Sequence, residues 1–212
     1  MRLPHPLLVI SDRKLARRPL ADVLEAAFAA GCRWVMLREK DLPAPALEAL
    51  ARELMALARR WDAAVSINGN AEVALAVGAA GVHLPQGRSP AAARRRLGSD
   101  ALIGVSAHGR GEASAAAAAG ADYVTLSPIF ASVSKPGYGP ALGLATLRRA
   151  AEGLPIPVLA LGGVTPENVA ACRTAGAAGI AVLGTVMAAE RPGEAVAALL
   201  ARFQNSTAWP AG

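Results

Sequence analysis

The sequence predicts an α/β fold of the TIM (β/α)8 barrel type, built as a single minimal domain. Short, uncharged apolar runs alternate with helix-forming stretches, and a junction in which a helix ends at glycine and a strand follows recurs along the chain. Two late apolar runs each end in glycine, which is typical of the phosphate site that such barrels build after strands seven and eight. Eight units in 212 residues are close to the lower limit for this fold and leave no room for a second domain.

Eight runs are predicted to be strands, because each is short, apolar and suited to burial on both faces of a parallel sheet. In chain order they are Leu7–Ser11, the run that ends at Leu37, Ala64–Asn68, the run that ends at Leu84, Leu102–Ser106, the run that ends at Leu126, Val158–Leu161 and the run that ends at Leu183. An open doubly wound sheet is the alternative, but its glycine-rich turn would follow the first strand.

The stretches between the strands are predicted to be helices. They are Leu20–Ala30, Pro45–Trp61, Ala71–Gly78, Pro90–Leu97, Glu112–Ala119, Leu144–Glu152, Pro166–Ala175 and Gly193–Phe203. In the second helix Leu47, Leu50, Leu54 and Leu57 recur with the helical period, which predicts one buried face. We expect the barrel to span residues 1–203 and residues 204–212 to form a loose C-terminal tail.

The composition, with 53% hydrophobic and 18% charged residues, fits one well-cored domain. Cys32 and Cys172 have no CxxC spacing, so we expect reduced core thiols in a cytoplasmic protein. The apolar run at the N-terminus is too short for a signal sequence, and no uncharged stretch is long enough to span a membrane. The net charge of +6 favours anionic ligands. Nucleic acid is not expected as a partner, because the basic run at 94–96 has no interleaved aromatic residues.

The clearest functional pattern lies at the glycines that follow the last two predicted strands. Gly162 and Gly163 would let the backbone approach a ligand closely, and Thr165 and Pro166 are predicted as the N-cap and first residue of a helix. The N–H groups and partial positive charge of a helix N-terminus suit a phosphate. The predicted phosphate-binding residues are therefore Gly162, Gly163, Leu183 and Gly184.

Polar side chains gather at the ends of the other predicted strands, where a barrel places its active site. Arg38 and Lys40 are two residues apart in an extended segment, so both side chains can point to the same side. Lys135 lies in a loop rich in Ser, Pro and Gly, a composition typical of a lid over a phosphate. The predicted substrate-binding residues are Arg38, Lys40, Asn68, His83, Ser106, Ser132, Ser134 and Lys135.

His108 is the predicted acid–base residue. It follows the fifth strand, two residues after Ser106, so both side chains should face the barrel mouth. Histidine is the side chain whose unperturbed pKa suits proton transfer near neutral pH. For His83, within an apolar strand, a hydrogen-bonded core role and a role in the site are both open. No metal site is predicted, because two histidines on separate strands without a third ligand do not make a zinc centre.

These patterns, taken in order, resemble the motifs of the thiamine phosphate synthase/TenI family over about residues 7–203. The segments that carry the resemblance are Leu37–Lys40, Ile67–Asn68, Gly81–Leu84, Ile103–His108, Gly120–Val124, Ser127–Phe130 leading to Ser134–Lys135, and Leu161–Pro166. The resemblance implies a TIM barrel that acts in thiamine biosynthesis on a thiazole phosphate.

One activity that the resemblance implies is that of the synthase, which uses magnesium to join an aminopyrimidine pyrophosphate to the thiazole phosphate and releases pyrophosphate. The family motif has Gln where this chain has Met36, and Asn-Asp where it has Asn68 and Gly69. The synthase also carries an aspartate a few residues after the strand-four histidine, where this chain runs Pro85–Ser89. Both family magnesium positions therefore lack the carboxylate that this hard cation prefers.

The other activity is that of the TenI branch, whose members are thiazole tautomerases. They move a proton on a thiazole carboxylate phosphate so that the ring becomes aromatic, and they need no metal. The Asn-Gly and Leu-Pro-x-Gly patterns of that branch are both present here, and His108 matches its proton-transfer histidine. The residues that match the synthase's pyrophosphate and pyrimidine pocket instead are Arg38, Lys40, His83, Gln86, Ser132, Ser134 and Lys135.

We therefore predict a metal-independent thiazole tautomerase, closer to the TenI branch at the metal-ligand positions, with His108 as its catalytic residue. The alternatives are a thiamine phosphate synthase and a non-catalytic protein that binds thiazole or thiamine phosphate. No cofactor is predicted, apart from Mg²⁺ if the chain is a synthase. The expected partner is a small-molecule thiazole phosphate, with no membrane partner, and a homo-oligomer is left open.

Overall fold

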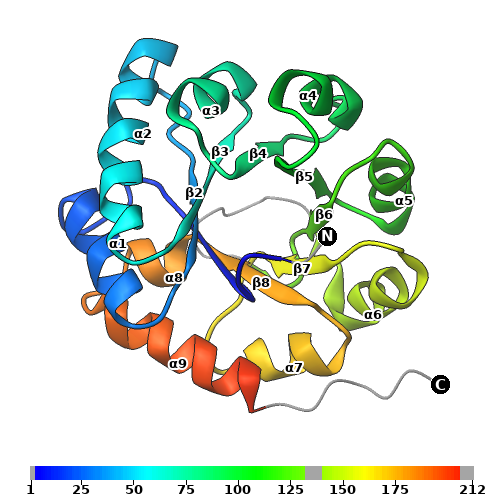
Figure 1. Ribbon diagram of the computed structural model, residues 1–212. Coiled ribbons are helices and arrows are strands. Elements are labelled where there is room, and N and C mark those ends of the chain that lie inside the picture. The colour runs from blue at the N-terminus through cyan, green and yellow to red at the C-terminus, as the bar shows by residue number, and fades with distance from the viewer. Residues whose placement is uncertain (1–2, 132–139, 206–212) are drawn as a thin grey trace.

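A computed structural model describes residues 3–131 and 140–205 of the chain as a closed barrel of parallel strands ringed by helices (Figure 1). Each strand pairs with its neighbour in sequence, and the first pairs with the last. The strands are β1 (Leu7–Ile10), β2 (Trp34–Leu37), β3 (Ala64–Asn68), β4 (Gly81–Leu84), β5 (Leu102–Ala107), β6 (Tyr123–Leu126), β7 (Val158–Leu161) and β8 (Gly179–Val182). The predicted (β/α)8 barrel is confirmed.

The helices alternate with the strands, as predicted. They are α1 (Leu20–Ala29), α2 (Ala44–Arg59), α3 (Ala71–Val77), α4 (Pro90–Leu97), α5 (Arg110–Ala118), α6 (Gly143–Gly153), α7 (Val169–Thr174), α8 (Gly184–Met187) and α9 (Pro192–Gln204). In α2, Leu47 and Leu54 are buried, while Leu50 and Leu57 pack half-buried against the core. The short helix α8 was not predicted, because four residues are too few to show a helical period.

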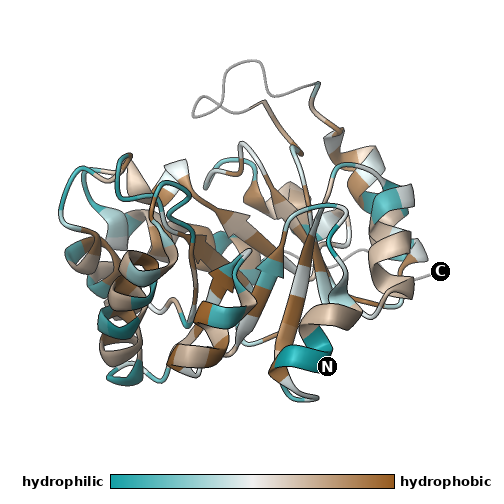
Figure 2. Cartoon of the chain, turned by 90° about the horizontal axis from the view of Figure 1, so that it is seen from above, coloured by the Kyte–Doolittle hydropathy of each residue, from teal (hydrophilic) through white to brown (hydrophobic). Residues whose placement is uncertain are grey.

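Alternate residues of the strands face two different cores. The larger core lies between the strands and the helical ring, and the smaller one fills the barrel with side chains that include Ile10, Trp34, Met36 and Tyr123. In Figure 2 the strands are mostly brown, the apolar colour, whereas the outer helices carry the teal of polar residues. This two-sided burial explains why the strands are uncharged apolar runs.

A chain of polar side chains crosses the inside of the barrel. The indole N–H of Trp34 donates to the hydroxyl of Ser66 at 3.0 Å, and the ring of Trp34 meets that of Tyr123 edge-on, with centroids 5.0 Å apart. The hydroxyl of Tyr123 lies 3.0 Å from Nδ1 of His83. A side chain at Gly104 would collide with both Tyr123 and His83, so glycine on β5 makes the space that they occupy.

The segment after β7 differs from the prediction. Thr165 is not an N-cap, since α7 begins at Val169 and residues 166–168 form a turn. The amide of Asn168 accepts a hydrogen bond from the N–H of Thr165 and donates one to the carbonyl oxygen of Gly163, both at 2.8 Å. This side chain satisfies loop backbone groups and so favours a turn over an earlier helix start.

The C-terminal end also differs in detail from the expected boundary at residue 203. Helix α9 includes Gln204 and is capped by Asn205, and the remainder of the predicted tail lies outside the described residues. Cys32 and Cys172 are free and buried, as predicted, and burial raises the pKa of the Cys32 thiol to about 11. Across residues 3–131 and 140–205, no helix has the length and apolar character needed to cross a membrane.

Candidate active site

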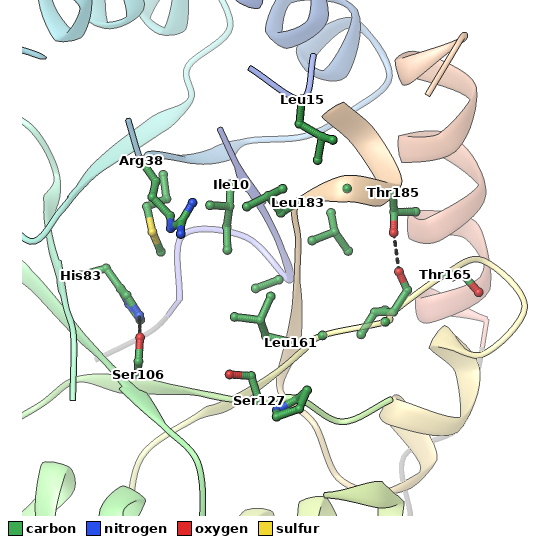
Figure 3. Close-up of a pocket in the computed structure, with 18 of the residues that line it drawn as sticks. Ile10, Leu15, Arg38, His83, Ser106, Ser127, Leu161, Thr165, Leu183 and Thr185 are labelled. Carbon is green, nitrogen blue, oxygen red and sulfur yellow. Dashed lines mark hydrogen bonds between the residues drawn. The ribbon is translucent and has the colours of Figure 1, made fainter. Parts of the chain in front are cut away.

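A cavity of about 1030 Å³ opens at the carboxyl ends of the strands. Its wall is apolar where Ile10, Leu161 and Leu183 meet, and polar groups lie on either side of them (Figure 3). The predicted residues that line it are Arg38, Lys40, Asn68, His83, Ser106, His108, Gly162, Gly163, Leu183 and Gly184. The structure therefore brings together every predicted site residue that it describes. Ser132, Ser134 and Lys135 lie outside the described residues.

The glycines after β7 are required by the loop that packs behind them. Gly162 and Gly163 have φ values of 93° and 62°, in the left-handed region that favours glycine. A Cβ at Gly163 would lie 2.8 Å from Cβ of Phe130 and would also meet the carbonyl oxygen of Ala131. We expected the lack of a side chain at these glycines to leave room for a ligand. At Gly163, the space that a Cβ would take is instead filled by the loop after β6. The backbone still lines the cavity.

The loops after β7 and β8 are joined by a hydrogen bond. The Oγ1 atom of Thr185, in the first turn of α8, donates to the carbonyl oxygen of Val164 at 2.6 Å (Figure 3). Gly184 and Thr185 line the cavity, and the first N–H groups of a helix have no partner within it, an arrangement that suits an anion. Thr185 was missed in the sequence, although it directly follows the predicted Gly184.

Arg38 and Lys40 form the cationic side of the cavity, at the end of β2. The Arg38 side chain is 15% exposed, and its Nη1 atom lies 3.8 Å from Oδ2 of Asp12. Lys40 is exposed at the rim. Glu39, between them, turns away from the cavity and is buried, as expected for alternating side chains in an extended segment. A mobile anion that enters the cavity would thus meet two cations from one strand end.

His83 serves both the core and the cavity. Its Nε2 atom lies 3.0 Å from Oγ of Ser106 and 3.3 Å from Oγ1 of Thr125, and its Nδ1 atom bonds Tyr123 (Figure 3). Burial lowers the pKa of His83 to about 3, so the imidazole is neutral at physiological pH. The ring is thus hydrogen-bonded within the core, as one of the two roles requires, and its Nε2 edge holds Ser106 at the cavity wall.

His108 lines the cavity and is fixed by hydrogen bonds to Ser127 and Glu112. Its Nδ1 atom lies 2.8 Å from the carbonyl oxygen of Ser127, and its N–H donates to Oε2 of Glu112 at 2.6 Å. A carbonyl oxygen only accepts, so Nδ1 carries the hydrogen, and in the neutral ring the lone pair belongs to Nε2. Ser127 could not be found from the sequence, because the carbonyl that orients the ring comes from the neighbouring strand end.

The chain matches a family model described as thiamine monophosphate synthase over residues 7–186. It is 47% identical to a Geobacter sulfurreducens protein named "Putative thiamine-phosphate synthase", with 97% of this chain and 98% of that protein covered. It is 40% identical to the thiamine-phosphate synthase of Roseiflexus castenholzii, with 90% and 85% covered. The solved thiamine phosphate pyrophosphorylase of Pyrococcus furiosus superposes with a TM-score of 0.84 at 31% identity, over 93% of this chain and 95% of that one. The chain therefore belongs to the thiamine monophosphate synthase family, as its motifs predicted.

Proposed function

We propose that the protein couples a hydroxymethylpyrimidine pyrophosphate to a thiazole phosphate and releases pyrophosphate, forming thiamine phosphate. This reverses the order of the two activities expected from the sequence. The full-length relatives that carry the synthase name support the change. The cavity, about 1030 Å³, lies at the upper end of the usual range of about 300–1,000 Å³ for ligand pockets and is consistent with two substrates.

The observation that carries this proposal is that one cavity is lined by two regions suited to anions. The glycine loops after β7 and β8 suit the phosphate of the thiazole, and Arg38 with Lys40 suits a pyrophosphate. The apolar surface of Ile10 and Leu183 lies between them (Figure 3). Two flat rings that rest on this surface would bring their reacting atoms together while their anionic groups point to opposite sides.

The proposed reaction forms a carbon–nitrogen bond and breaks a carbon–oxygen bond. The thiazole nitrogen supplies the electron pair, the pyrimidine methylene carbon accepts it, and the electrons of the breaking bond leave with pyrophosphate. Negative charge therefore grows on the leaving group, where fixed cations stabilise it more than they stabilise the bound substrate. Arg38 and Lys40 are the described residues placed to do this.

The described residues do not fit the magnesium site that the family resemblance implies. A protein-bound Mg²⁺ takes one or two carboxylates in addition to substrate phosphates. Asn68, at the end of β3, and Gln86, after β4, line the cavity with amides, and positions 69, 87 and 88 carry no carboxylate. Residues 3–131 and 140–205 hold no group of three His, Cys, Asp or Glu side chains that could bind a metal. We derive no step of the reaction through a metal.

Thiazole tautomerase activity is the second candidate, and the glycine loops together with His108 support it. That reaction needs a phosphate anchor and a positioned acid–base group and takes no metal. His108 provides such a group, because the carbonyl of Ser127 fixes its tautomer and aims the ring along the cavity wall. A protein that carries out this reaction would use the glycine loops in the same way but would not need the full length of the cavity.

An assay of the purified protein with both substrate sets separates the two candidates. One set holds hydroxymethylpyrimidine pyrophosphate with thiazole phosphate, the other holds the thiazole carboxylate phosphate tautomer, and each is run with magnesium and with EDTA. Formation of thiamine phosphate with release of pyrophosphate supports the proposed coupling. Aromatisation of the tautomer without any coupling, unaffected by EDTA, would replace it with the second candidate. Binding of thiazole phosphate with neither reaction would leave a non-catalytic binder.

A further inference from the structure

Glu39 is the one buried carboxylate among the residues that the structure describes, and it takes no part in the proposed chemistry. Its side chain is 2% exposed, yet it does not line the cavity that the residues on either side of it line. A buried charge is costly unless hydrogen bonds and an opposite charge compensate for it. A carboxylate at this place in the chain therefore needs a structural reason.

Among the described residues, the partners of the Glu39 carboxylate come from the loop that follows β1. The hydroxyl of Ser11 donates to Oε1 at 2.7 Å, the N–H of Arg13 donates to Oε2 at 3.1 Å, and Nη1 of Arg13 donates to Oε2 at 3.0 Å. Both carboxylate oxygens are thus occupied, and the β1–α1 loop is tied to the end of β2. Leu15, four residues further on from Ser11, lines the cavity.

Ser11 carries the connection on to Arg38. Its Oγ atom accepts a hydrogen bond from the N–H of Arg38 at 2.9 Å, and its own N–H donates to the carbonyl oxygen of Met36 at 2.9 Å. Ser11 is fully buried. The hydrogen bonds therefore run without a gap from the Arg38 backbone, through the Ser11 hydroxyl, to the Glu39 carboxylate.

We propose that Glu39 is a positioning residue that fixes the Arg38 side chain for the pyrophosphate group, through Ser11 and the β1–α1 loop. The inference rests on the proposed function, because it gives Arg38 an anion to bind. The next residue of the same loop, Asp12, approaches the Arg38 guanidinium at 3.8 Å. Loosening the loop would release both the backbone and the side-chain restraint on Arg38.

The direction in which Glu39→Gln changes the affinity for an anion distinguishes a positioning role of Glu39 from a purely electrostatic one. Glu39 brings a negative charge close to an anion-binding strand end. If only charge mattered, neutral Gln at this position would reduce repulsion and tighten the binding of an anion. If Glu39 acts by positioning Arg38, Glu39→Gln weakens binding, because an NH2 donor replaces one carboxylate oxygen and faces the donors of Ser11 or Arg13, which releases the loop. Residues that orient the ligands of a metal typically contribute about 10–100-fold to its affinity, and we expect an effect at the lower end of that range here.

The test is calorimetric titration of inorganic pyrophosphate into the full-length protein at one ionic strength. Glu39→Gln and Ser11→Ala are each expected to weaken binding about tenfold or more. Asp41→Asn is the matched control, because Asp41 also pairs with Arg13, at 2.7 Å, but is exposed and lies outside the chain of hydrogen bonds that joins Arg38, Ser11 and Glu39. We expect it to change affinity less than about twofold, as is usual for exposed ion pairs.

A double-mutant cycle shows whether Glu39 acts through Arg38. Arg38→Met and the double variant Arg38→Met with Glu39→Gln should bind pyrophosphate with the same affinity. A residue that acts only by positioning Arg38 has no further effect once the Arg38 guanidinium is removed. Tighter or unchanged binding by Glu39→Gln, or full additivity with Arg38→Met, overturns the proposal. If Glu39→Gln does not fold, Ser11→Ala, which changes no charge, decides the question in the same cycle. A wild-type protein without Arg38-dependent pyrophosphate binding overturns the proposed function as well.

Discussion

The Oγ1 atom of Thr185 donates a hydrogen bond to the carbonyl oxygen of Val164 at 2.6 Å and so joins the two loops that form the predicted phosphate site. Thr185→Val keeps the shape of the side chain and removes the donor. A hydrogen bond of this kind contributes about 0.5–1.5 kcal/mol, so we expect the KM for thiazole phosphate to rise roughly three- to tenfold with little change in kcat. Thr185→Ser keeps the hydroxyl and should stay near wild type in steady-state kinetics. Equal KM values for all three proteins would show that the loops do not need this bond.

A side chain at Gly163 is expected to destabilise the fold through both backbone strain and collision. Gly78 serves as a control that has the strain without the collision. Gly163→Ala combines a left-handed backbone with a collision against Phe130 and Ala131. Gly78 has nearly the same φ, 63° against 62°, but nothing within 4 Å of an added Cβ. Backbone strain costs about 1–3 kcal/mol in both variants, and overpacking adds about 1–3 kcal/mol to Gly163→Ala alone. Urea unfolding measures the difference, and equal losses would mean that the loop after β6 yields freely.

The buried imidazole of His83 makes stability depend on pH. Its pKa in the folded protein is about 3, below the ordinary value of 6.5, so the unfolded chain takes up a proton first as the pH falls. The contribution to stability is complete above about pH 6.5 and is lost as the pH falls toward 3, at most about 1.4 kcal/mol per pH unit. Urea unfolding between about pH 7 and about pH 5 should give a shallower dependence for His83→Gln than for wild type. Parallel curves would mean that His83 is not buried and neutral.

His108 should distinguish the two candidate reactions. A positioned acid–base group contributes about 10²–10⁴-fold to a proton transfer, so His108→Asn should lower tautomerase turnover by such a factor. The coupling reaction moves an electron pair from nitrogen to carbon, so its rate should fall by less than about tenfold in the same variant. The measurement is kcat for each reaction that the wild type performs. A loss of coupling as large as that expected for proton transfer would give His108 a role in the coupling step.

Much of the fold could be predicted because a parallel barrel leaves a clear trace in sequence. Strands buried on both faces are mostly apolar, as Val158–Leu161 is, and several helices end in a turn that glycine favours. The start of α7 could not be predicted, because it depends on the bonds of the Asn168 amide to Gly163 and Thr165. Periodicity also gave no sign of α8, which has too few residues.

The location of the site could be predicted from the rule that barrels place their chemistry at the carboxyl ends of the strands. This rule was enough for Arg38 and His108, which line the cavity. The sequence could not show that Ser127 orients His108 or that Thr185 bonds Val164, since both contacts join strand ends far apart in the chain. The roles of the residues in catalysis and binding remain predictions.

The measurement that tests the central claim most directly is the stoichiometry of products from the two-substrate reaction. The purified protein is incubated with hydroxymethylpyrimidine pyrophosphate and thiazole phosphate, and thiamine phosphate and pyrophosphate are quantified over time. Coupling predicts that both products appear in equal amounts, and that Arg38→Met slows the reaction by roughly tenfold or more through loss of a charge-assisted contact to the leaving group. Absence of both products, in a protein that aromatises the thiazole carboxylate phosphate, would contradict the account.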